Sequence, residues 1–346
     1  MVRKTAELIA RALDVSGVLG ALERLDSSSG LRVLVYHRVD EPSAEPDLDP
    51  GLISATPDEF RVQMQLVAKH YHPVPLRTVL AAQRGEVSLP SGAVLITFDD
   101  GYLDFAVHAW PVLRDLGLPA VLFVPTAFPD QANGPGFWWD RLYAGLRRAK
   151  SRVVNLPDLG EFDLAEVGGQ RFALNACKRH VKSLPHAEAM DWVDAALGEL
   201  AEIPSLARVL SWDSLRELTR QGLDVCAHGH LHALCTRLTA DELKDDLITC
   251  RARLASELGG DFCASVLCWP ANACSHQVCE IARGLGFEMA FGGVRGVARV
   301  PVRDALDVMR IPVLRYQQAL FRAQLRPGIA GLGRWVVDRP RSAAVK

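Results

Sequence analysis

Blocks of apolar and polar residues along the chain predict parallel strands separated by helices. Apolar runs rich in β-branched residues predict buried strands at residues 31–36, 93–98, 119–124, 223–227, 266–270 and 289–291. Helical spacing of apolar residues predicts helices that begin after Thr56, as the N-cap, and at 109–116, 212–220, 241–258 and 277–285. This alternation is typical of parallel β/α units, which build a barrel or an open sheet.

An amphipathic helix is predicted near the N-terminus. Its apolar stripe within residues 5–25 consists of Leu8, Ala12, Val15, Leu19 and Leu22. The opposite face is not notably basic, so we expect the stripe to pack on the core or on a second copy rather than on a membrane surface.

The same pattern divides the chain into segments. Residues 1–30 are expected to form the N-terminal helix and a linker, 31–320 the main domain, and 321–346 a basic tail. Within the main domain, about 140–210 is predicted to be a helical, polar insertion without a clear strand. Such an insertion would serve as a lid or a substrate wall.

Composition narrows the class of protein. The 346 residues are 49% hydrophobic with a formal net charge of −2, and the basic residues are scattered, which argues against a nucleic-acid partner. All eight cysteines lie between Cys177 and Cys279 without a C-x-x-C pair, which favours reduced thiols. Charged residues interrupt the N-terminal apolar positions, so we expect an unexported, cytoplasmic protein; association with the inner face of a membrane and the number of subunits stay open.

Chemically useful residues follow four of the predicted strands. Asp99 and Asp100 come directly after one strand, and His37 follows another. A third strand is followed by the segment 228–232, which has a histidine at each end. The fourth strand ends in the segment 269–272. Functional groups gather at the carboxyl ends of the strands in parallel β/α folds, so these segments are expected to share one rim.

A metal site is the simplest reason to bury two adjacent aspartates. Both carboxylates would repel each other unless a cation or hydrogen-bond donors compensate, although a solvated Asp-Asp-Gly turn is the alternative for this stretch alone. His228 and His232 are four residues apart, and with Asp100 they would form a set of three ligands that leaves positions open for water and substrate. The amidohydrolase H-x-H motif is a weaker interpretation of His228 and His230, because that motif belongs on the first barrel strand.

The motif Thr97-Phe98-Asp99-Asp100-Gly101-Tyr102, followed by His228-x-x-x-His232, resembles the polysaccharide deacetylases of carbohydrate esterase family 4. The likeness covers roughly residues 31 to 315. It includes the segments 36–39, 118–124, 210–212 and 310–313. The resemblance implies a distorted, incomplete (β/α)7 barrel in an α/β fold.

The resemblance also implies roles for individual residues. Asp100, His228 and His232 would bind a divalent metal, usually zinc, and Asp99 would be the catalytic base. The backbone N–H of Tyr102 would stabilise the oxyanion. The implied substrate is an N-acetylated saccharide, which for an unexported protein would be a cytosolic or lipid-linked precursor.

Departures from the family pattern bear on the substrate floor and on the proton donor. Gly229 replaces a usual Ser or Thr, and Cys268 replaces an arginine that orients the base in many relatives. The Pro270-Ala271-Asn272 segment stands where relatives have Pro-Tyr-Gly, so the substrate floor is altered, and Pro270 is expected to contact the substrate there. No late Leu-x-His segment is found to supply the general acid. His37 is the first candidate for that role, followed by His276 or Asp99 itself.

Three further residues are candidates for substrate contact. Arg310 could orient Asp99, bind an anionic substrate group, or form an ordinary ion pair. Trp139 and Trp269 could stack on sugar rings, although tryptophans more often belong to the core. The predicted function is metal-dependent N-deacetylation of a saccharide. Hydrolysis of a cyclic imide or ureide, or saccharide binding without turnover, are the alternatives.

Overall fold

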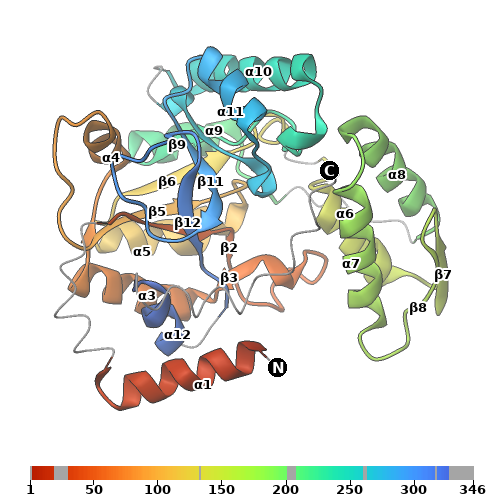
Figure 1. Ribbon diagram of the computed structural model, residues 1–346. Coiled ribbons are helices and arrows are strands. Elements are labelled where there is room, and N and C mark those ends of the chain that lie inside the picture. The colour runs from red at the N-terminus through yellow and green to blue at the C-terminus, as the bar shows by residue number, and fades with distance from the viewer. Residues whose placement is uncertain are drawn as a thin grey trace.

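The structure is a computed structural model, which describes residues 2–18, 30–131, 134–200, 208–259, 263–315 and 318–326. Its centre is a barrel of seven parallel strands (Figure 1). In spatial order the strands are β1 (Arg32–Tyr36), β5 (Ala93–Phe98), β6 (Ala120–Val124), β9 (Asp224–Ala227), β10 (Val266–Cys268), β11 (Met289–Arg295) and β12 (Val308–Pro312). Strand β1 pairs with both β5 and β12, which closes the ring.

The predicted (β/α)7 barrel is therefore confirmed, and it has one strand fewer than the eight of a full β/α barrel. The short strand β4 (His72–Pro73) pairs with β5 beside the ring. A separate parallel pair is formed by β2 (Arg38–Val39) and β3 (Ile53–Ala55).

Helices pack around the strands. They are α3 (Pro57–His70), α4 (Leu76–Gln83), a π-helical turn (Phe105–Ala109) continued by α5 (Trp110–Asp115), α9 (Trp212–Arg220), α10 (Ala240–Leu258) and α11 (His276–Gly284). The helices predicted from apolar spacing correspond to α3, α5, α9, α10 and α11. Thr56 caps α3 as expected, because its hydroxyl accepts the N–H of Glu59 while the Glu59 carboxylate accepts the N–H of Thr56.

Alternation along the strands divides the core into two clusters. Val33, Leu95 and Val121 belong to a cluster to which every barrel strand contributes, so this cluster fills the barrel. Their neighbours Leu34 and Leu122 belong to a larger cluster shared with the surrounding helices. Alternate residues along each strand thus face the barrel interior and the surrounding helices.

The predicted insertion lies between β6 and β9 in the sequence. It forms a lobe beside the barrel (Figure 1). It contains α6 (Trp138–Arg148), β7 (Val153–Leu156), β8 (Gly160–Asp163), α7 (Gly169–Val181) and α8 (His186–Gly198), and it has its own hydrophobic cluster. The expectation of no strand here was wrong, since β7 and β8 form an antiparallel hairpin. Each strand has only four residues, too few for a clear alternating pattern.

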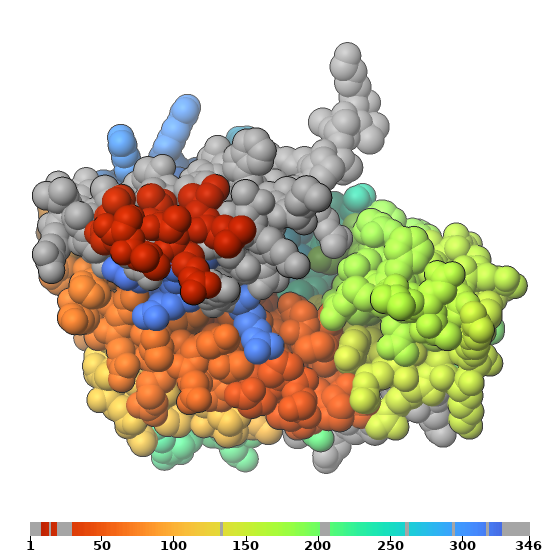
Figure 2. Space-filling view, turned by 90° about the horizontal axis from the view of Figure 1, so that it is seen from below, coloured from red at the N-terminus to blue at the C-terminus, as the bar shows by residue number. Residues whose placement is uncertain are grey.

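The N-terminal helix α1 (Val2–Val15) packs against α12 (Gln318–Gln324), as Figure 2 shows. The contact uses Ala10 and Leu13 rather than the predicted stripe. Leu8 is 67% exposed and Val15 is 82% exposed, so the predicted stripe does not pack on the core of this chain, and its packing on a second copy stays a prediction. Small alanines on both helices form much of the contact. Leu19, Leu22 and most of the expected linker lie outside the described residues.

The main domain extends further than predicted. Phe321 and Leu325 are buried in the large cluster around the barrel, so they are not part of a tail. The rest of the expected tail, 327–346, lies outside the described residues. All eight cysteines are free thiols, as expected. No helix in the described part of the chain is long and apolar enough to cross a bilayer.

Candidate active site

The predicted strand-end residues do meet at one end of the barrel. His37 follows β1, Asp99 and Asp100 follow β5, and His228 follows β9. These residues line a cavity of about 200 Å³. The other residues of its wall are Val35, Leu52, Trp138, Trp139, Lys178, Lys182, His232, Leu234, Ala271, Asn272, Arg295, Arg310 and Pro312.

Asp100, His228 and His232 converge on one point. The Nε2 atoms of His228 and His232 lie 3.3 and 3.2 Å from the same carboxylate oxygen, Oδ1 of Asp100. All three side chains are buried, and their ligand atoms lie within 4.8 Å of one another. Burial raises the pKa of Asp100, but the contacts of its carboxylate with the two histidine rings outweigh burial and hold that pKa well below its usual range.

Backbone geometry turns the two aspartates in different directions. Asp100 and Gly101 both have left-handed backbone, with φ of 75° and 73°. This conformation is costly for Asp100, and it breaks the alternation of the strand at the point where β5 ends. Asp100 thereby meets the histidines, while Asp99 faces Arg310.

Asp246 holds the histidine loop in place. Its carboxylate accepts the backbone N–H groups of His230 at 2.8 Å and of Leu231 at 2.9 Å. Gly229, between them and His228, has φ of 72°, and a Cβ there would lie 2.9 Å from Oδ2 of Asp246. The glycine in place of the usual Ser or Thr therefore fits the close approach of this carboxylate.

The three side chains fit a divalent cation. The carbonyl oxygen of Cys268 lies 2.7 Å from Nδ1 of His228, and since a carbonyl only accepts, the proton sits on Nδ1. The Nε2 lone pair of neutral His228 then faces an oxygen of Asp100, which is repulsive unless a proton or a metal ion lies between them. Tetrahedral ligands with bonds of 2.0–2.1 Å stand about 3.3–3.4 Å apart, close to the observed spacing.

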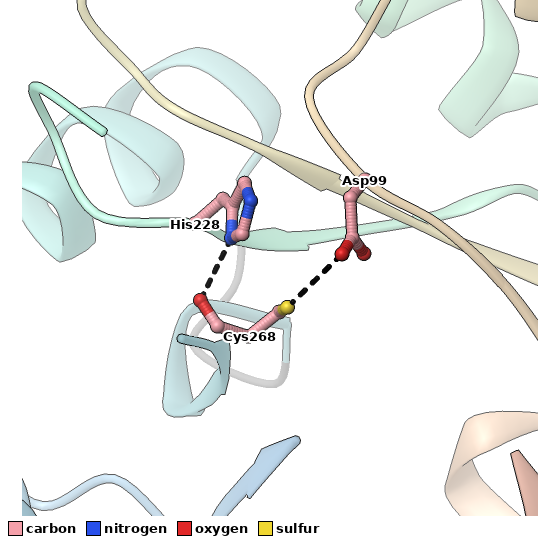
Figure 3. A group of neighbouring side chains, drawn as sticks. All are labelled: Asp99, His228 and Cys268. Atoms are coloured by element: carbon pink, nitrogen blue, oxygen red, sulfur yellow. Dashed lines mark hydrogen bonds between the residues drawn. The ribbon is translucent and has the colours of Figure 1, made fainter. Parts of the chain in front are cut away.

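Asp99 is buried and held by Arg310. The Nη1 group of Arg310, from β12, donates to both carboxylate oxygens at 2.9 Å. The Cys268 thiol donates a hydrogen bond to the Asp99 carboxylate (Figure 3), and its sulfur lies 3.5 Å from Oδ2. Nε2 of His37 lies 4.0 Å from the same oxygen. Burial raises the pKa of Asp99, but the positive charge of Arg310 outweighs it and keeps the pKa below its ordinary value.

The contact of Arg310 with Asp99 agrees with two of its three interpretations, orientation of that carboxylate and an ordinary ion pair. Its Nη2 also donates to Oδ1 of Asn272 at 3.0 Å, which links β12 to the segment after β10. The position where relatives carry an arginine holds Cys268, and here the guanidinium reaches the same carboxylate from another strand. Strand β12 was not predicted, because its apolar run is short and ends in Pro312.

A hydrogen-bond chain connects the Asp-Asp turn to the insertion. The Tyr102 hydroxyl donates to Asp140 at 2.7 Å, and the Trp139 indole donates to the Tyr102 hydroxyl at 2.8 Å. The backbone N–H of Asp49 donates to the other oxygen of Asp140. Burial raises the pKa of Asp140 to about 6. Sequence reasoning missed Asp49 and Asp140, since single aspartates carry no spacing signal.

Tyr102 and Val209 form an isolated antiparallel β-bridge, and the backbone N–H of Tyr102 makes neither of its hydrogen bonds. That bridge is made by Leu103, which donates to Arg208, and by Leu210, which donates to Gly101. Trp139 lines the cavity, as expected for a substrate contact.

Three predicted site residues lie outside the cavity wall. Trp269 is 0% exposed, and its indole donates to the Leu306 carbonyl. Its side chain faces the helices rather than the cavity, so the predicted sugar stacking is wrong. Pro270 is buried and lies outside the cavity wall. His276 is on α11 with a side chain 90% exposed, close to Glu280, so it is not in the site.

The chain matches a known protein family. The family model described as polysaccharide deacetylase matches residues 86–290, which is more than half of the chain. The fold is a parallel α/β barrel, and the family match defines the class of protein as a hydrolase. The chain belongs to the polysaccharide deacetylase family, which confirms the resemblance.

Individual relatives are more distant. Residues of this chain are 32% identical over 94 positions to poly-beta-1,6-N-acetyl-D-glucosamine N-deacetylase of Escherichia coli strain K12; this match covers 27% of this chain and only 13% of that protein. The Streptococcus pyogenes deacetylase PplD, solved with acetate, has a TM-score of 0.55 at 16% identity, covering 82% of this chain and 92% of its own. The BpsB deacetylase domain of Bordetella bronchiseptica has a TM-score of 0.52 at 17% identity, covering 84% and 98%. These two structures support the fold.

The Arg310–Asp99 pair predicts how stability depends on pH. With Arg310 present, Asp99 stabilises the fold above its ordinary pKa, and this contribution is lost as pH falls through the lower folded pKa. In Arg310→Met, burial dominates and raises the pKa of Asp99, so ionisation destabilises the fold as pH rises. The free energy of unfolding of the variant should therefore fall increasingly below that of wild type as pH rises from about 3 to about 7. Over this range the difference between the two proteins should grow by about 1.4 kcal/mol or more.

Urea unfolding of metal-free protein measures this difference. The exposed Arg179 on α7 provides the control, and Arg179→Met should differ from wild type by a constant amount across the range. A pH-independent difference for Arg310→Met would contradict the assigned role of the pair.

Proposed function

We propose that this protein is a metal-dependent deacetylase that hydrolyses an N-acetyl group on a saccharide. The observation that carries the proposal is the placement of Asp99 beside the Asp100–His228–His232 set in one cavity. A carboxylate kept ionised by Arg310 next to a candidate cation site suits hydrolysis of an amide by water. Membership of the polysaccharide deacetylase family supports the same reaction.

Asp100, His228 and His232 would hold the cation, and two nitrogens with one oxygen suit zinc. A bound divalent cation supplies a Lewis acid, which polarises the acetyl carbonyl and lowers the pKa of water toward about 7. The hydrogen bond from His228 Nδ1 to the Cys268 carbonyl fixes the ring so that Nε2 serves as the ligand.

Asp99 acts as the general base in this proposal. Its lowered pKa keeps the carboxylate ionised at neutral pH, and Arg310 fixes its orientation. The carboxylate takes a proton from the attacking water as the new carbon–oxygen bond forms. Each carboxylate oxygen has two lone pairs, so the bond from Arg310 still leaves capacity for that proton.

The Tyr102 backbone N–H would stabilise the oxyanion that develops on the acetyl carbonyl. This amide takes no part in the bridge to Val209, and the bond from the Tyr102 hydroxyl to Asp140 holds the residue in place. Trp139 offers an aromatic face in the same cavity for the C–H side of a sugar ring.

The leaving amine needs a proton, which we assign to His37. Its ring lines the cavity, is 35% exposed, and lies 4.0 Å from the base. Asp99, once protonated, is the other possible donor. The products are acetate and a free amino sugar.

The reaction is tested by acetate release from metal-reconstituted protein. N-acetylated monosaccharides, oligosaccharides and lipid-linked saccharides serve as substrates, with a cyclic imide and a ureide as comparisons. We expect acetate release from at least one saccharide, a loss of at least about 100-fold after chelation, and recovery when Zn2+ is added back. Turnover of the cyclic amides alone would contradict the proposal, as would one tightly bound metal without any turnover.

His37→Gln should lower kcat about 100-fold with little change in KM, because the variant keeps a polar side chain but cannot donate a titratable proton. His276→Gln is the control, since His276 is exposed and outside the cavity. An unchanged kcat in His37→Gln would assign the proton transfer to Asp99 instead.

A further inference from the structure

Positive charge exceeds negative charge in the wall of the cavity. Among the described residues that line it, four carry cationic side chains, namely Lys178, Lys182, Arg295 and Arg310. The carboxylates of this wall are Asp99 and Asp100. Asp99 is paired with Arg310, and Asp100 is held by the two histidines. Lys178, Lys182 and Arg295 line the same wall, so its cationic side chains outnumber its carboxylates.

Lys178 belongs to a cluster in which one carboxylate meets two cations. Its ammonium lies 2.5 Å from Oδ2 of Asp49, and Arg171 contacts the other oxygen of the same carboxylate at 3.0 Å. Asp49 itself is buried and does not line the cavity. Lys178 therefore lines the cavity while it shares the buried Asp49 carboxylate with Arg171.

Lys182 lies one helical turn beyond Lys178 at the end of α7. Residues four apart share a helix face, and like charges at this spacing destabilise a helix slightly. A favourable interaction with the helix dipole explains why cations occur near this end. It does not explain why both side chains line the same cavity, and Arg179, at the same helix end, is not part of that wall.

We propose that the cavity takes an N-acetylated saccharide that carries a negatively charged group, and that Lys178 and Lys182 bind this group. The inference rests on the proposed function, because it concerns the saccharide of that reaction. The insertion supplies both lysines on α7 and the aromatic rings of Trp138 and Trp139 on α6. It thus provides a surface for the sugar and a counter-charge for its anionic group.

Binding to Asp99→Asn protein tests this inference independently of turnover. Calorimetry compares N-acetylglucosamine 1-phosphate and N-acetylmuramic acid with the neutral methyl glycoside of N-acetylglucosamine. The two anionic ligands distinguish a phosphate from a carboxylate. We expect at least one of them to bind about tenfold or more tightly than the neutral ligand, with the advantage shrinking as salt is added.

Charge removal identifies the groups responsible. Lys178→Met and Lys182→Met together keep most of the apolar stems and should reduce the preference to less than about threefold. Lys244→Met on the surface of α10 is the matched control and should leave the preference intact. Equal binding of neutral and anionic ligands would overturn the inference, as would a preference that survives in the double variant.

The two proposals fail in different ways. Absence of acetate release from every substrate would refute the deacetylase but would not alter the lysine-dependent preference in binding. Acetate release from neutral saccharides together with no anion preference would leave the deacetylase standing and refute the anion site.

Discussion

Burial of two adjacent carboxylates is the constraint on which the rest of the site depends. Asp99 and Asp100 are both almost inaccessible to water, and two unpaired charges there would be very costly. The left-handed backbone at Asp100 directs the two carboxylates to different partners. Arg310 compensates Asp99, while His228 and His232 surround Asp100 in a geometry that fits a cation. The segments that carry these partners are brought to one rim because the strands are parallel and the barrel closes.

Sequence reasoning was most successful where a pattern repeats or where motifs combine. Apolar runs predicted six of the seven barrel strands, and the Asp-Asp and His-x-x-x-His spacings predicted the buried cluster at the rim. The missing strand, β12, is short and ends in proline, yet it carries Arg310. Its partner Asp99 lies 211 positions away in the chain, so only the closed barrel shows that the two side chains meet.

The direction of single side chains was the other feature that could not be predicted from the sequence. Trp269 follows a strand that points to the rim, but its ring turns to the helices, where its indole meets the Leu306 carbonyl. Trp139, in contrast, lines the cavity because it lies in the first turn of α6 and is fixed by Tyr102. The insertion is therefore coupled to the Asp-Asp turn: Asp140 accepts from Tyr102, and Asp49 connects Asp140 to Lys178 on α7. Single residues of this kind have no periodicity from which to predict them.

The most direct test of the account exchanges the two neighbouring carboxylates one at a time for amides of the same shape. Asp99→Asn and Asp100→Asn are compared for bound metal and for acetate release after identical reconstitution. Asp99→Asn is expected to keep one equivalent of metal and to lose about 100-fold or more of its turnover, whereas Asp100→Asn is expected to lose the metal as well. Full turnover in Asp99→Asn, or metal retained equally by both variants, would contradict the separate roles assigned to these two residues.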